Sequence, residues 1–377
     1  MDELEKLICD LVSIDSVNPD LSPGGRGEEE VARFAAGWLE KAGLEVHLDE
    51  VKPGRPNVIA VARGSGGGRT LMLNGHTDVV NPAGMPDAFK PVIRDGRLYG
   101  RGSYDMKGGL AACMLAAARA STAKLRGDVI LTAVMDEEYA GLGTIHAAGR
   151  YKADAAIIAE ATGMELVVAH RGFVWLEIET IGVAAHGSRP DLGVDAISKM
   201  GYVLTALDRL NKDLMANPRH PLLGGGSLHA SLIQGGLELA TYPDRCCLSI
   251  ERRTIPGETP ESVEEEIRQI LAAIHEKDPS FKADVRRLLY RSPMETPQDA
   301  EILPVIRQTS AAVLGHPVTV SGVPYWTDAA TLSAAGIPCV LFGPSGAGAH
   351  AVEEWVNLDS VRDCAEIYLA AAQEFCR

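Results

Sequence analysis

Four apolar segments of this chain each run into a histidine or an acidic residue. The junctions are 70–74 followed by His76, 128–135 followed by Asp136-Glu137-Glu138, 155–159 followed by Glu160, and 338–342 followed through a glycine-rich stretch by His350. If the segments are parallel strands of one sheet, their carboxyl ends share an edge, which is where open α/β sheets bind ligands. The sequence therefore predicts that these side chains gather at one site.

The residue types at this edge favour a metal centre. Imidazole and carboxylate groups without a thiolate suit zinc, with cobalt or manganese as substitutes. Taken singly, each residue has an ordinary interpretation, because a histidine after a strand is usually a surface or capping residue and an acidic run is usually a solvated loop. Two histidines and four acids on one edge would be a costly charge cluster without cations.

Asp105 stands in a glycine-rich turn that covers residues 100–109. Glycine on both sides lets the backbone come close, so Asp105 is suited to bridge two ions, which lie roughly 3.5–4 Å apart in two-metal sites. Hydrolysis at such a site also needs an acid that holds no metal and accepts a proton from the attacking water. Glu137 and Glu138 are adjacent, so one of them can bind metal while the other acts as the base.

The remaining pattern predicts the scaffold. Apolar residues at helical spacing predict helices, and segments that are apolar throughout alternate with them. The expected helices include 4–12, 28–42, 107–120 and 357–375. This alternation indicates an α/β fold, with a mostly parallel sheet covered by helices on both faces. Residues 57–62 and 70–74 read as two strands, and we expect the Gly64–Gly68 run between them to form a hairpin turn.

The pattern changes between residues 172 and 284. Residues 173–181 alternate apolar and polar side chains with a period of two, as in a strand with one open face. Two further strands and two helices follow, and Thr259-Pro260 is a typical start for the second helix. We expect a smaller α+β domain at 172–284, inserted into a larger domain formed by 1–171 and 285–377.

Composition narrows the partners. The chain has 377 residues and a net charge of −15, which argues against nucleic acid and anionic membranes as partners. Its length fits two domains, and no apolar run is long enough to predict a membrane span. Seven cysteines without C-x-x-C spacing, and an acidic N-terminus without the pattern of an export signal, predict a cytoplasmic protein with reduced thiols.

The motifs resemble those of the M20 metallopeptidase family, which includes acetylornithine deacetylase, succinyl-diaminopimelate desuccinylase, aminoacylase-1 and carboxypeptidase G2. The resemblance runs nearly end to end and rests on His76-Thr-Asp78-Val-Val, the Asp105 turn, Asp136-Glu137-Glu138 and Gly343-Pro…Ala349-His350. It implies a zinc-peptidase-like catalytic domain with two zinc ions per chain. The implied ligands are His76 and Glu160 on one ion, Glu138 and His350 on the other, and Asp105 bridging both.

The same resemblance implies further roles. Asp78 would orient the imidazole of His76, and Glu137 would be the general base. The inserted domain would be a lid that also dimerises, so a homodimer is expected. In it, His186 matches a histidine that reaches the partner's active site to stabilise the oxyanion. Arg253 matches an arginine that binds a substrate carboxylate.

Two positions in the inserted domain depart from the family pattern. Leu239-Ala240-Thr241-Tyr242-Pro243 lacks an Asn that the family often has before this Pro, and Glu251 replaces an Asp that is common there. Both departures leave the identity of the acyl group and of the amino acid open.

The expected function is that of a two-zinc hydrolase that cleaves an amide bond next to a carboxylate, in an N-acyl amino acid. A dipeptidase or carboxypeptidase of the same family is the alternative, because such substrates also place a carboxylate beside the scissile amide. A catalytically inactive metal-binding interaction protein is a third interpretation, and the intact Asp78, Glu137 and His186 argue against it. A nucleotide-binding protein is disfavoured, since no G-x-G-x-x-G follows a strand and opens a helix.

Overall fold

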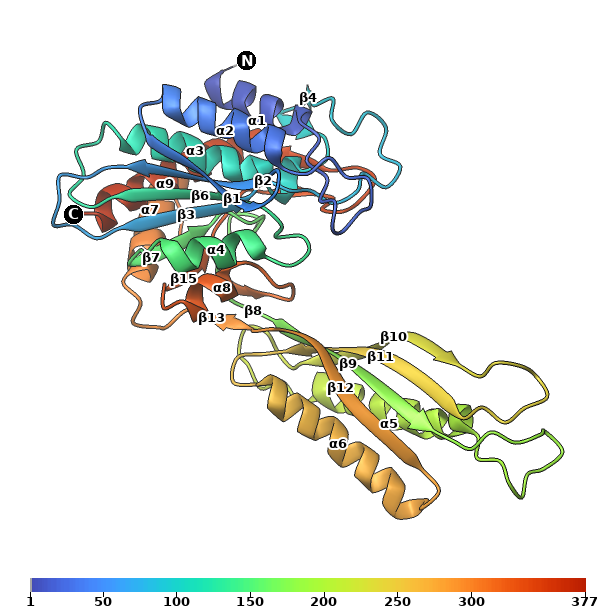
Figure 1. The fold of residues 1–377 in the computed structure, drawn as a ribbon. Coiled ribbons are helices and arrows are strands. Elements are labelled where there is room, and N and C mark those ends of the chain that lie inside the picture. The colour runs from blue at the N-terminus through green and yellow to red at the C-terminus, as the bar shows by residue number, and fades with distance from the viewer. Residues whose placement is uncertain (1) are drawn as a thin grey trace. The chain divides into compact units, whose positions relative to one another are not determined.

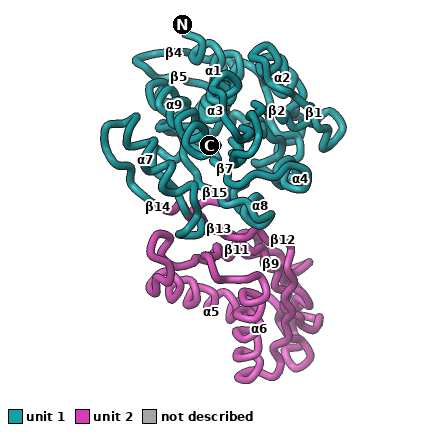
Figure 2. Tube along the Cα trace, turned by 90° about the vertical axis from the view of Figure 1, so that its left-hand side faces the viewer, with its two compact units in different colours: residues 1–168, 296–321, 327–377 teal, residues 169–295, 322–326 magenta. Residues whose placement is uncertain are grey.

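The computed structural model describes residues 2–377, which form two compact units (Figure 2). Unit 1 holds the residues up to Val168, together with Thr296–Ser321 and Thr327–Arg377. Unit 2 holds Ala169–Glu295 and Gly322–Trp326. Within residues 2–377, no helix is both long enough and apolar enough to cross a membrane.

Unit 1 is built on a mixed sheet with helices on both faces (Figure 1). Its helices are α1 (Glu3–Ser13), α2 (Glu29–Lys41), α3 (Gly108–Ala120), α4 (Leu142–Arg150), α7 (Ile302–Leu314), α8 (Ala329–Ala334) and α9 (Leu358–Phe375). The sheet strands are, in spatial order, β1 (Glu45–Lys52), β2 (Arg55–Ala62), β6 (Val129–Val134), β3 (Leu71–His76), β7 (Ala155–Ile158), β15 (Cys339–Leu341), β8 (Leu166–His170) and β13 (Met294–Glu295), with β14 (Val320–Val323) paired to β8. Of these, β13 belongs to unit 2, and β8 and β14 each begin in unit 1 and end in unit 2. A small second sheet has the order β16 (Gly346–Ala347), β17 (Trp355–Asn357), β5 (Arg97–Tyr99) and β4 (Val92–Arg94).

The apolar strands of unit 1 are buried on both faces. In β2, Val58, Ala60 and Ala62 pack into the core formed with α1, α2, α3, α7 and α9. Ile59 and Val61 point to the opposite side and pack against Ala147 of α4. Because successive side chains of a strand alternate between faces, a strand covered on both sides must be apolar throughout. The predicted α/β class with a doubly covered sheet is confirmed.

The parallel part of the sheet is its centre. Strands β6, β3, β7 and β15 run parallel to one another, whereas β2 pairs antiparallel with β6. Strand β6 therefore lies between β2 and β3, and the hairpin predicted at Gly64–Gly68 is wrong.

The glycines of that run serve close packing. A Cβ on Gly64 would lie 2.3 Å from the carbonyl oxygen of Gly127, and a Cβ on Gly68 would lie 2.3 Å from the nitrogen of Gly127. Both distances are too short for any side chain, so these glycines let the loop pass against the turn that leads into β6.

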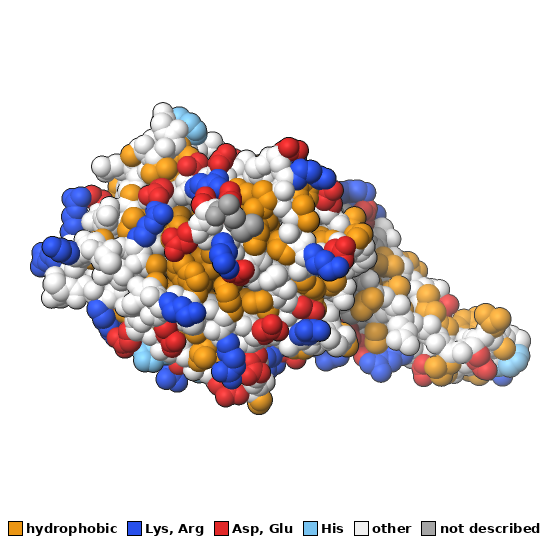
Figure 3. Space-filling view, turned by 90° about the horizontal axis from the view of Figure 1, so that it is seen from above, with side chains coloured by type: hydrophobic (Ala, Val, Ile, Leu, Met, Phe, Trp, Pro, Cys, Tyr) orange, Lys and Arg blue, Asp and Glu red, His pale blue; other side chains and the backbone are white. Residues whose placement is uncertain are grey.

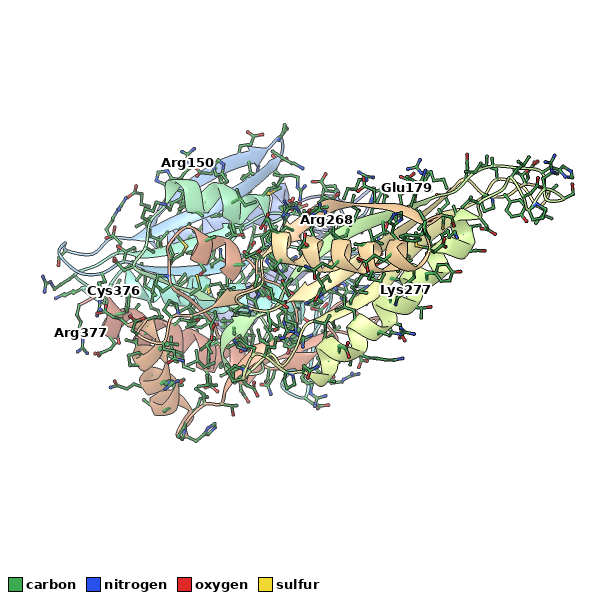
Figure 4. The ribbon with its side chains drawn as sticks, turned by 90° about the horizontal axis from the view of Figure 1, so that it is seen from below. Arg150, Glu179, Arg268, Lys277, Cys376 and Arg377 are labelled. Carbon is green, nitrogen blue, oxygen red and sulfur yellow. The ribbon has the colours of Figure 1, made fainter. Side chains whose placement is uncertain are left out.

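Unit 2 is a four-stranded antiparallel sheet in the order β10 (Ser227–Gly235), β11 (Arg245–Thr254), β9 (Gly172–Ile181) and β12 (Lys282–Arg291). Val174, Leu176 and Ile178 are buried against α5 (Ala196–Ala216) and α6 (Pro260–Lys277), while Trp175 on the other face is exposed. The sheet thus has one open face, as the period of two predicted. Thr259 caps α6 by accepting a hydrogen bond from the Ser262 N–H, and Arg268 and Lys277 lie on that helix (Figure 4).

Acidic and basic side chains are interspersed on the face shown in Figure 3, rather than separated into patches of one sign. The negative charge of the chain is thus not concentrated on this face.

We expect Gly109→Ala to lower the free energy of unfolding by about 1–3 kcal/mol, because an added methyl group overfills a packed site. A Cβ on Gly109 would lie 2.0 Å from the carbonyl oxygen of Ala159, the residue before Glu160. Gly37→Ala in α2 is the control, since nothing lies within 4 Å of its Cβ position and alanine is favoured in helices by about 0.5–1 kcal/mol. Urea unfolding of both variants checks this, and equal stability of the two would contradict the packing argument.

Candidate metal centre

The four predicted junctions lie on adjacent parallel strands. Strand β3 ends at His76, and the neighbouring strands β6 and β7 are followed by Asp136-Glu137-Glu138 and by Glu160. Strand β15, next to β7, leads into the loop that carries His350. Because the strands are parallel, all four junctions lie at the same edge of the sheet.

Asp105 lies between the two histidines. Its Oδ1 atom is 3.3 Å from Nε2 of His76, and its Oδ2 atom is 3.2 Å from Nε2 of His350. Burial acts to raise the pKa of Asp105, but hydrogen bonds with His350 and His76 outweigh it and hold the pKa below its ordinary value. One carboxylate thus faces two imidazoles with its two oxygens, which is the arrangement that a bridging ligand needs.

Two further carboxylates complete the cluster. Oε1 of Glu160 lies 3.8 Å from Nε2 of His76, and Oε2 of Glu138 lies 3.1 Å from Nε2 of His350. Ligands about 2.0–2.2 Å from a tetrahedral zinc lie roughly 3.3–3.6 Å from one another. The observed separations are therefore close to those of two coordination spheres that share Asp105.

The carboxylates at this edge lack compensating positive side chains, as expected of a site that binds cations. In the described part of the chain, no lysine or arginine pairs with Asp105, Glu137, Glu138 or Glu160. The Oε1 atom of Glu138 is buried without a hydrogen-bond partner. Burial raises the pKa of Glu138 to about 7 and that of Glu160 to about 8, and both shifts are increased by the charge of Asp105. Bound divalent ions would supply the missing positive charge.

Glu137 lies in the same cluster. Ligand atoms of His76, Glu137 and Glu160 lie within 4.8 Å of one another, as do those of His76, Asp105 and Glu138. Burial, opposed by the charge of His76 and reinforced by that of Glu160, raises the pKa of Glu137 well above its ordinary value. An acid whose environment shifts its pKa in this way is a candidate for general acid and base work.

Asp78 is fully buried and contacts both sides of the centre. Its Oδ1 atom lies 3.4 Å from Nδ1 of His76, and its two oxygens accept hydrogen bonds from the backbone N–H groups of Glu137 and Glu138, at 3.2 Å each. Nδ1 of His76 is also 2.9 Å from the Asp78 carbonyl oxygen. These contacts fix the ring of His76 with Nε2 toward Asp105 and Glu160.

Glu354 holds the turn that carries Asp105, and this role of Glu354 was not predicted from the sequence. This buried carboxylate accepts hydrogen bonds from the N–H groups of Tyr104 and Asp105 with one oxygen, and from Arg101 and the Gly102 N–H with the other. Nothing in the sequence distinguishes Glu354 from the exposed Glu353 beside it.

His186 and Arg253, the other two predicted site residues, lie in unit 2. His186 is exposed, and its Nδ1 accepts a hydrogen bond from the Ser188 N–H at 3.2 Å. The neutral ring therefore carries its proton on Nε2, where it can donate a hydrogen bond.

Arg253 is held against its own strand and its neighbour. Its Nε donates to Glu251 at 2.6 Å, and its guanidinium lies 5.1 Å from the ring centre of Phe173. The second oxygen of Glu251 accepts from Nε1 of Trp175 at 2.7 Å. Glu251, where the family often has Asp, thus orients Arg253.

Comparison with known proteins identifies the family. Residues 72–374 match peptidase family M20/M25/M40. The chain is a member of this family. An acetylornithine deacetylase from Myxococcus xanthus is 32% identical to this M20 chain over 355 residues, which cover 91% of each protein. An N-formyl-4-amino-5-aminomethyl-2-methylpyrimidine deformylase from Bacillus subtilis is 28% identical and covers 94% of this chain and 91% of its own.

The fold of this M20 chain is also that of solved structures. Aminopeptidase PepT from Bacillus cereus superposes with a TM-score of 0.81 at 20% identity, over 99% of this chain and 98% of PepT. Together these findings confirm the predicted family and fold, and they make the chain a metal-dependent amidohydrolase that hydrolyses amide bonds.

We expect the melting temperature of the metal-free protein to fall as pH rises between about 5 and 9. Glu160 has its pKa raised from 4.5 to about 8, mainly by burial. His350 has its pKa raised from 6.5 to about 10, mainly by hydrogen bonds with Asp105 and Glu138. Between pH 4.5 and about 8, Glu160 holds a proton in the folded protein that it has released in the unfolded chain, and the same is true of His350 between pH 6.5 and about 10. Rising pH therefore favours unfolding.

Scanning calorimetry of chelator-treated protein across this range measures the effect. Saturating zinc should flatten the pH dependence, because the ions supply the positive charge, and Glu160→Gln should make the metal-free slope shallower. The same slope with and without zinc would contradict a metal centre at these residues.

Proposed function

We propose that the chain is a two-zinc hydrolase that removes the acyl group from an N-acyl amino acid. The observation that carries this proposal is the placement of Asp105 between His76 and His350, with one carboxylate oxygen toward each imidazole. His76 and Glu160 would hold one ion, Glu138 and His350 the other, and Asp105 both. Cobalt or manganese can also occupy sites with such ligands, so the choice of zinc as the metal is itself part of the proposal.

Bound ions of this kind polarise the scissile carbonyl and make the attacking water more acidic. Glu137 accepts the proton of that water and returns it to the leaving amine. Its neighbour Glu138 contacts His350, whereas the carboxylate of Glu137 has no hydrogen bond among the described residues. This difference supports Glu137 as the base and Glu138 as the ligand.

Arg253 supports a substrate with a carboxylate beside the amide. Its Nε is occupied by Glu251, and the rest of the guanidinium remains able to form two parallel hydrogen bonds to a carboxylate. The similarity to an acetylornithine deacetylase favours deacylation. A dipeptidase or carboxypeptidase activity is the second candidate, because the same contact with Arg253 serves either substrate.

Unit 2 supports a homodimer. Among residues 2–377, strand β10 pairs only with β11 and so forms an edge of its sheet, where Leu232 is 72% and Ile233 56% exposed. Exposed apolar edges are a liability unless they are paired. Two β10 edges meeting across a two-fold axis would cover them and give an isologous dimer, with the inserted domain at 172–284 as the dimerisation domain. A cytoplasmic location remains part of the proposal.

Glu137→Gln should lower kcat about 10²–10⁴-fold while leaving the metal content unchanged, because the proton acceptor is lost and the ligands remain. Glu138→Gln should instead reduce the bound metal, since it removes a ligand. Kinetics combined with elemental analysis of the two purified variants checks the assignment. If the two variants exchange these properties, Glu138 is the base.

Arg253→Ala should raise KM about 10–100-fold for N-acyl amino acids, because a charged hydrogen-bond donor is worth about 1.5–3 kcal/mol. Arg245→Ala is the matched control, since Arg245 lies on the same strand and pairs with Glu179. A panel of N-acetyl amino acids, dipeptides and methyl esters should show deacylation of free acids as the fastest reaction. Equal rates on an acid and its ester would show that no carboxylate is read.

His186 is expected to act in the active site of the partner subunit. Its protonated Nε2 is a suitable donor to an oxyanion. An inactive His186→Ala protein mixed with an inactive Glu137→Gln protein should then recover about one quarter of native activity after subunit exchange, because half of the dimers are mixed and each holds one intact site. The absence of recovery despite proven exchange would place His186 outside the partner's site.

A further inference from the structure

Asn18 lies in the segment between α1 and α2, beside the metal centre, and its side chain is completely buried. Its Nδ2 donates to Asp78 at 2.8 Å and to Asp136 at 3.1 Å. Its Oδ1 accepts from the backbone N–H groups of Asp20 and Leu21. An amide side chain has two donor hydrogens and two acceptor sites, so every hydrogen-bonding position of Asn18 is used.

The two carboxylates that Asn18 joins, those of Asp78 and Asp136, both help to position Glu137 and Glu138. Asp136 directly precedes the pair and has a left-handed backbone with φ of 70°, which is uncommon for a residue other than glycine. Asp78 accepts the N–H groups of Glu137 and Glu138 and faces the ring of His76. Asn18 therefore contacts the carboxylates that hold ligands of both proposed ions.

A buried ion pair holds the same turn from its other side. Arg55 donates to Glu28 with Nε at 2.6 Å and with Nη2 at 2.5 Å, and its Nη2 also lies 3.2 Å from Oδ1 of Asp136. Glu28 in turn accepts the Asp136 N–H at 3.3 Å. Arg55 makes no hydrogen bond to Asp78, so the amide of Asn18 is the side-chain donor that Asp78 and Asp136 share.

We propose that Asn18 is a positioning residue of the metal centre. Its amide links Asp78 to Asp136 and thereby sets both the ring of His76 and the turn that carries Glu137 and Glu138. Without this donor, two buried carboxylates face each other across the vacated position, and like charges in a buried site repel. The turn and the ring then lose their common anchor, which weakens the binding of both ions.

The inference rests on the proposed two-ion function, and metal binding rather than catalysis tests it. Zinc is titrated by calorimetry into chelator-stripped full-length protein. Asn18→Asp keeps the acceptor for Asp20 and Leu21 but loses the amide donors, and Asn18→Ala loses both. Asn357→Ala is the matched control, because Oδ1 of Asn357 also accepts two backbone N–H groups, at the start of α9, and its side chain contacts none of the proposed ligands.

Both Asn18 variants should bind zinc about 10–100-fold more weakly than the native protein, as substitutions behind metal ligands do. Asn18→Asp should be at least as weak as Asn18→Ala, because it adds a third carboxylate. The visible absorption of the cobalt-loaded variants should change, whereas Asn357→Ala should match the native protein in both measurements. Asn18→Ser retains one donor and gives the same comparison, with a smaller loss, if the other two variants do not fold.

Native zinc affinity in folded Asn18→Asp would overturn the inference, as would an equal loss of affinity in Asn357→Ala. If the native protein itself takes up no zinc, cobalt or manganese, the proposed function fails instead. The two failures are therefore distinguishable.

Discussion

Four carboxylates at one sheet edge are the constraint on which the rest of this structure depends. Asp105, Glu137, Glu138 and Glu160 meet there with two imidazoles, and none of them pairs with a lysine or arginine in the described residues. Burial raises the pKa values of the three glutamates, so the protein without ions holds them at a cost in stability. Divalent ions would remove that cost, and their positive charge would polarise the scissile carbonyl of an amide.

The scaffold places these groups by topology and fixes them by buried hydrogen bonds. Four parallel strands bring four loops to one edge, but a strand end alone does not fix the direction of a side chain. Asp78, Glu354 and Asn18 provide that direction through contacts with backbone N–H groups and with other carboxylates. The precision of the centre thus depends on side chains that are not themselves proposed ligands.

Much of this arrangement was predictable because apolar strands and the residues after them are local features. His76, Glu138 and Glu160 each follow a continuous apolar run, and parallel strands then bring them together. Which strand lies next to which in the sheet depends on residues far apart in the sequence. The hairpin predicted at Gly64–Gly68 is therefore wrong, because β6 lies between β2 and β3. Glu354 and Asn18 were missed for a related reason, since their partners lie far away in the sequence. The roles of His186 and Arg253 remain predictions.

Anomalous diffraction from zinc-loaded crystals, recorded on both sides of the zinc absorption edge, tests the central claim most directly. Our account predicts two zinc peaks in each chain, roughly 3.5–4 Å apart, with Asp105 between them and with His76 and His350 on different ions. Glu137 should contact neither peak. A single peak, or two peaks without Asp105 between them, would contradict the account.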